Sequence, residues 1–173
     1  MSLECYLADV LAKPVDPWDA FKEDTRRFKA ALALRDKLIS KPGIFVSLKS
    51  QSMLNDDVLI VTIKTQGSNW LEVGVPDDEY METEPVHFCA YARTGEDAVK
   101  IEKVTSHFQK FARDRSLDVV GLFFMRGHDP KASIRAVVFE EAISWEEFVH
   151  DEKDSSATVE KLVELIRQLP KFN

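Results

Sequence analysis

A histidine stands beside an aspartate and between two arginines in the segment FFMRGHDPKASIRAVV, residues 123–138. In an enzyme, Asp129 would orient His128 as a general base while the flanking arginines hold an anion. The Gly, Asp and Pro residues of 127–131 are also turn formers placed between two apolar runs, and the side chains of adjacent residues usually diverge. We therefore interpret 127–131 as a hairpin loop, and keep His128 and Arg135 only as candidates for a ligand pocket.

A second chemical pattern is the His87-x-Cys89 pair in VHFCAYAR, residues 86–93. On a strand these two side chains share one face with Tyr91 and Arg93, which would suit a metal or a thiol with a neighbouring base. A zinc site needs three or four ligands, and the other histidines fall on other predicted elements. A small buried thiol is the simpler interpretation.

The six glycines of the chain form neither nucleotide-binding motif, G-x-G-x-x-G or G-x-x-x-x-G-K. We therefore predict no catalytic residue, no metal and no cofactor. The alternative is a small-ligand site or an active site in a pocket between the sheet and a helix, lined by His87, Tyr91 and Arg93 together with His128 and Arg135.

Charge is distributed unevenly along the chain. Residues 22–41 hold seven basic and three acidic residues, whereas residues 77–84 hold five acids and no base. The acidic segment surrounds two large apolar side chains, which is typical of an exposed anchor for a basic partner. The predicted partner-binding residues are Asp77, Asp78, Glu79, Tyr80 and Met81 in the acidic segment, with Arg26 and Arg27 in the basic one. The alternative is a solubilising loop that folds back on the sheet, and a basic segment that complements the acidic ones.

Hydrophobic periodicity predicts the elements that position these residues. A helix is expected from the cap Asp16 and Pro17 to the stop at 41–43, because apolar residues recur there at three- and four-residue steps. Strands are expected at 44–49, 58–63, 70–75 and 86–93, with 58–63 apolar on both faces and therefore central and covered twice.

In the second half, a helix is expected to start near 94–97, and a hairpin of 119–125 and 134–139 follows it. Ser144 and Glu147 have capping-box spacing and predict a short helix. Residues 150–156 are expected to be a solvated break before a final amphipathic helix that ends at Pro170. The order predicts one α+β domain over residues 1–173, a mostly antiparallel sheet of about six strands with N-terminal, middle and C-terminal helices packed on it.

The chain totals narrow the classes of protein. With 173 residues and a net charge of −7, one core is expected, and binding to nucleic acid or an anionic membrane is not. The two cysteines are too few for a disulfide framework, and no apolar run is long enough for a bilayer, so a cytoplasmic location is expected.

The resulting hypothesis is a non-enzymatic protein-interaction module that uses charge-segregated surfaces, such as an adaptor, a secretion chaperone, or an inhibitor or immunity-type binder. The element order resembles the layout of type III secretion chaperones, although no sequence motif carries that resemblance. The expected partner is another protein, and a homodimer is compatible with the sequence.

Overall fold

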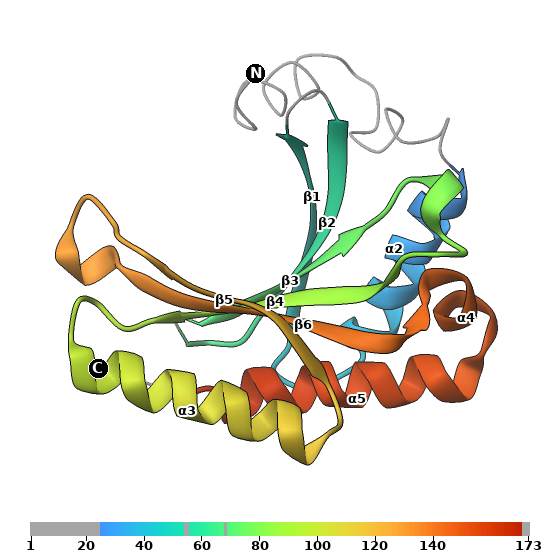
Figure 1. The fold of residues 1–173 in the computed structure, drawn as a ribbon. Helices are drawn as coiled ribbons and strands as arrows, with labels where there is room; N and C mark the ends of the chain where they lie inside the picture. The colour runs from blue at the N-terminus through green and yellow to red at the C-terminus, as the bar shows by residue number, and fades with distance from the viewer. Residues whose placement is uncertain (1–24, 54–55, 68, 171–173) are drawn as a thin grey trace.

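The computed structural model describes residues 25–53, 56–67 and 69–170. They form an α+β fold in which N-terminal, middle and C-terminal helices pack on one six-stranded antiparallel sheet (Figure 1). The sheet has the strand order β1-β2-β3-β4-β6-β5. This is the predicted fold class. The predictions for residues 1–12 and for the helix start at Asp16 and Pro17 lie outside the described residues.

Each strand of the sheet lies at one of the positions expected from periodicity, and several continue past the expected ends. They are β1 (Phe45–Met53), β2 (Asp56–Lys64), β3 (Trp70–Val75), β4 (Pro85–Arg93), β5 (Asp118–Met125) and β6 (Ile134–Ser144). The described α-helices are α2 (Thr25–Ile39), α3 (Ala98–Asp114), α4 (Trp145–His150) and α5 (Glu152–Gln168), and two short 3-10 helices are η2 (Asp78–Tyr80) and η3 (Pro130–Ala132).

Local sequence signals explain the helix ends. After α2 the chain turns at Gly43, which has φ +74°, a conformation that favours glycine. Asp97 caps α3 by accepting hydrogen bonds from the backbone N–H groups of residues 99 and 100. Ser144 and Glu147 form the predicted capping box of α4.

The predicted solvated break at 150–156 is wrong, because α5 already begins at Glu152. The side chain of Asp151 accepts hydrogen bonds from the backbone N–H groups of Lys153 and Asp154, so a single capping residue separates α4 from α5. Acidic residues in the first turn also interact favourably with the positive end of the helix dipole. The charged run is therefore a helix start, and its Ser155 is buried.

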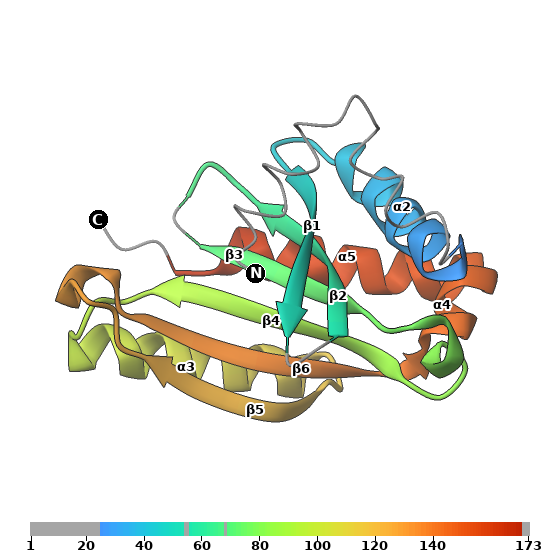
Figure 2. The same ribbon diagram turned by 90° about the horizontal axis from the view of Figure 1, so that it is seen from above.

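The helices cover one face of the sheet, which we call the covered face. Val86, Phe88, Ala90 and Ala92 of β4 point to this face and join the core cluster with α2, α3, α4 and α5. In Figure 1, α3 and α5 run beneath the sheet, and Figure 2 shows α2 beside its β1–β2 side. The alternate residues of β4 point to the opposite face, which we call the open face.

Strand β2 is buried on both faces, as its apolar run predicts. Ile60 and Thr62 point to the open face and are nevertheless buried, together with Val61 and Ile63 on the covered face. β2 is an interior strand that pairs with β1 and β3, and it lies second from the β1 edge. An apolar run reports burial but not the order of strands.

Candidate functional site

The basic helix and the acidic segment contact one another. The Arg27 Nη1 atom lies 2.7 Å from Asp77 Oδ1, and the backbone N–H of Arg27 donates to Asp78 Oδ1 at 2.7 Å. Arg26 forms a 2.5 Å ion pair with Glu146 and lies 3.9 Å from Glu82. The two segments thus compensate each other's charge within the chain, which is the alternative that the sequence left open.

The acidic segment offers only one exposed apolar side chain. Met81 is 1% exposed and belongs to the core, whereas Tyr80 is 47% exposed on η2. Glu79 is exposed beside it. The two-residue apolar anchor expected at 80–81 is therefore reduced to Tyr80, since the backbone N–H of Glu146 donates to the Met81 carbonyl and draws this residue towards α4.

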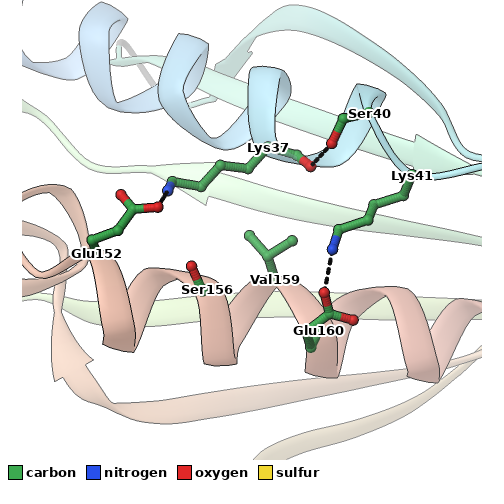
Figure 3. A pocket seen from close by; sticks show the side chains of 7 residues that line it. All are labelled: Lys37, Ser40, Lys41, Glu152, Ser156, Val159 and Glu160. Carbon is green, nitrogen blue, oxygen red and sulfur yellow. Dashed lines mark hydrogen bonds and ion pairs between the residues drawn. The ribbon is translucent and has the colours of Figure 1, made fainter.

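A small pocket between α2 and α5 is also internally compensated (Figure 3). It encloses about 230 Å³ above the buried side chain of Val159. Lys37 pairs with Glu152 at 2.6 Å, and Lys41 pairs with Glu160. Both cations that line the pocket are thus neutralised, which gives an anion little to bind.

The hairpin loop is confirmed as a turn. Asp129 Oδ1 accepts a hydrogen bond from the Lys131 backbone N–H at 2.9 Å and caps η3, while His128 is exposed. Arg135 points to the covered face, where its Nε donates to Thr105 Oγ1 of α3 at 3.0 Å. The structure therefore does not bring Arg135 to the open face, and His128 is an exposed residue of the hairpin loop.

The open face carries the remaining predicted residues, His87, Tyr91 and Arg93, with Cys89 between them. They alternate along β4 with the core residues that face the helices and so point the other way, and the predicted pocket between the sheet and a helix is not formed by this set. His87 Nε2 lies 2.7 Å from Glu140 Oε2, its cross-strand partner on β6. In the residues that the structure describes, no three His, Cys, Asp or Glu side chains are placed to hold a metal ion.

The thiol and the phenol on this face are poor nucleophiles at neutral pH. Burial raises the pKa of Cys89 to about 11, so the thiol is protonated. Burial, together with the hydrogen bond to Cys89, also raises the pKa of Tyr91. His87 is held by Glu140 and not by the thiol. This arrangement does not favour the thiol–base chemistry considered from the sequence.

A row of register partners that contains four aromatic residues crosses the open face. Following the register from strand to strand, its members are Phe45, Lys64, Trp70, Tyr91, Ala136 and Phe123. The Trp70 and Tyr91 rings stack with centroids 4.8 Å apart and planes 8° apart. Phe45 and Phe123, at the two ends, are more than half exposed. We call this set the aromatic row.

Two cations lie in or beside the aromatic row. The Arg93 guanidinium lies 5.9 Å from the centroid of the Trp70 ring, and Lys64 lies in the row itself. Glu72, on the same face of β3, pairs with Lys49 and accepts a 3.3 Å hydrogen bond from Trp70 Nε1. Within the described ranges, neither Lys64 nor Arg93 has a carboxylate at ion-pair distance. The row therefore combines two exposed end rings and two half-buried central rings with positive charge.

Comparisons with protein-family models, curated proteins and solved structures give no match to this chain. None of the helices in 25–53, 56–67 and 69–170 has the length and apolar character needed to cross a bilayer. The function therefore has to be inferred from the open face itself.

Proposed function

We propose that this chain is a non-enzymatic protein-interaction module that binds its partner along the aromatic row of the open face. The proposal rests on one observation: helices cover one face of the sheet, while the other carries four rings in one register line, of which the end rings Phe45 and Phe123 are exposed and the two central rings are half-buried. Exposed aromatic side chains on a rigid surface are frequent anchors in protein interfaces. A cytoplasmic location, expected from the sequence, is part of the proposal.

The row suggests the size and chemistry of the partner. Six strands at about 4.8 Å spacing give a row about 24 Å long, which matches roughly seven residues of extended chain. Phe45 and Phe123 favour apolar side chains at the two ends of such a segment. Lys64 and Arg93 favour an acidic residue between them. We therefore propose an extended, acidic and apolar peptide segment as the partner.

The surface proposed here differs from the charge-segregated one expected from the sequence. Arg27 and Asp77 bind each other, so a partner would have to displace an existing contact to use them. The aromatic row requires no such displacement. Because Cys89 is protonated and His87 pairs with Glu140, an enzymatic role has less support than a binding role.

The test is binding of fluorescent eight-residue peptides that vary in acidic and aromatic content. Peptides with an acidic centre and apolar ends should bind the wild-type chain, and Trp70→Ser should weaken this binding at least tenfold. Lys64→Glu should also weaken the binding, and the loss should be larger at low salt than at high salt.

Tyr80→Ser is the matched control, because Tyr80 is an exposed ring on the acidic segment. The proposal predicts unchanged peptide binding for this variant. Loss of binding in Tyr80→Ser but not in Trp70→Ser would return the site to the acidic segment. Preference for a single-stranded oligonucleotide over every peptide would show that the row stacks bases, and would contradict the proposal.

A further inference from the structure

The sheet edge formed by β5 is apolar and exposed on both faces. Half of the exposed large hydrophobic residues in the described ranges belong to this one strand, with 37–53% of each accessible: Val119, Val120, Phe123, Phe124 and Met125. The register with β6 places Phe123 and Met125 on the open face and Phe124 on the covered face. Beyond β5 no further strand follows in the described residues.

The opposite edge of the sheet provides an internal comparison. Strand β1 has the sequence FVSLKSQSM, in which Lys49 and several polar residues follow Phe45. From Val119 to Met125, β5 has the sequence VVGLFFM, without a charge, a proline or a polar side chain. Proteins usually protect an edge strand with charges or proline because its unpaired backbone groups invite another strand. This chain has protective residues on β1 and lacks them on β5.

We propose that β5 pairs antiparallel with β5 of a second copy of this chain, forming a two-fold dimer with one continuous sheet. An edge strand that is apolar on both faces pairs best with another strand that is apolar on both faces. β5 of a second copy is such a strand. Antiparallel pairing also sets the Asp118 end of each copy against the Arg126 end of the other; Arg126 pairs with Glu96 of its own chain at 2.8 Å, but its guanidinium is 75% exposed and has further N–H groups for a second carboxylate. Parallel pairing would place like charges together.

The local geometry leaves a regular segment for this pairing. The bulge in β5 lies between Val119 and Gly121, so Gly121–Met125 keep a regular register with β6. The Phe123 ring leans over Gly121, where a Cβ atom would lie 2.5 Å from the ring. The glycine therefore lets the ring lie along the strand. Such a narrow interface is expected to give a dissociation constant of roughly micromolar order.

The dimer does not depend on the proposed peptide binding, because it uses the strand edge and not the central part of the aromatic row. A two-fold axis perpendicular to the sheet keeps both open faces on the same side. The aromatic rows of the two copies would then meet at their Phe123 ends. The dimer thus gives the proposed binding surface twice its length, while neither proposal requires the other.

The experiment is sedimentation velocity on the full chain over a concentration range from about 1 to 300 μM, which brackets the expected micromolar constant. The wild type should move from monomer to dimer, and Val120→Lys and Phe124→Lys should each weaken the dimer at least tenfold. Ile39→Lys on α2 is the matched control, because Ile39 is an apolar residue with 59% exposure, and α2 packs on the β1–β2 side of the sheet, away from β5 (Figure 2). It should dimerise as the wild type does.

Circular dichroism of each variant excludes loss of folding as the cause. Asp118→Arg should also weaken the dimer, and Asp118→Arg combined with Arg126→Asp should restore it, since the pairing is antiparallel. A wild type that stays monomeric throughout the range would overturn the proposal. So would a dimer that both Val120→Lys and Phe124→Lys leave intact.

Discussion

Trp70 and Tyr91 lie face to face across β3 and β4, with ring centroids 4.8 Å apart and planes only 8° from parallel. They are direct cross-strand partners in the register, so the backbone pairing alone brings the rings together. Each ring restricts the rotamers of the other before any partner binds. This lowers the loss of side-chain entropy that accompanies binding to the open face.

The stack should be measurable as a coupling energy. A double-mutant cycle of Trp70→Leu and Tyr91→Leu, followed by urea unfolding, should give about 0.5–1.5 kcal/mol of coupling. The control cycle combines Trp70→Leu with Phe123→Leu, in the same row but separated by two strands, and should give almost none. Equal coupling in the two cycles would show that the rings do not interact specifically.

Arg27 should contribute more to stability than its neighbour in sequence. Its side chain is 7% exposed and donates to Asp77, whereas the Arg26 side chain is 44% exposed. Arg27→Met should lower the free energy of unfolding by about 1.5–3 kcal/mol, because it leaves Asp77 without its charged donor. Arg26→Met should lower it less. Urea unfolding of both variants measures the difference, and a larger effect at Arg26 would contradict the contact described here.

The imidazole of His107 should make folding sensitive to mild acid. Burial, with the nearby charges of Lys110 and Arg115, lowers its pKa from the usual 6.5. Its Nε2 atom is buried without a hydrogen-bond partner among the described residues. The folded chain therefore binds this proton more weakly than the unfolded chain does. Stability should be full above pH 6.5 and should fall as the pH decreases below it.

Melting temperatures between pH 8 and pH 5.5 test this expectation, because carboxyl groups titrate mainly below that window. In His107→Gln the decrease should be smaller than in the wild type. His128→Gln, which changes the exposed histidine of the hairpin loop, should retain the wild-type decrease. If His107→Gln also retains it, the pH dependence arises elsewhere.

The Cys89 thiol should react slowly in the folded chain. Burial raises its pKa from 9.0 to about 11, which lowers the thiolate fraction at pH 8 roughly hundredfold. In a Cys5→Ser background, alkylation by iodoacetamide should therefore be much slower in buffer than in denaturing urea. Mass spectrometry at timed intervals gives both rates. Similar rates would mean that Cys89 is an accessible, activated thiol.

The sequence predicts the two faces of β4 correctly, since Phe88 and Ala90 alternate with Cys89 and Tyr91 along one strand. It predicts the fold class and the turn at Asp129 for the same reason: these features depend on neighbours in sequence. The aromatic row depends on register between strands distant in sequence, so Phe45 and Phe123 could not be assigned to one line.

Two features of the predicted partner-binding segments could not be predicted from the sequence, for the same reason. The burial of Met81 depends on contact with α4, and the charge of Arg27 is compensated by a loop about 50 residues away. A run of acids looks solvated when tertiary partners are unknown. The start of α5 differs from the sequence prediction for another reason: Asp151 caps the helix within a charged stretch, so a run of charges does not by itself indicate a break between helices.

The polar character of β1 limits how large an assembly this sheet can build. Lys49 lies near the middle of that strand and pairs inward with Glu72, so a strand approaching this side would meet a charged rim. An apolar β5 opposite an apolar β1 would allow copies to add end to end into a growing fibril. Because β5 is the one edge of the described sheet that is suited to pairing, the proposed assembly stops at two copies.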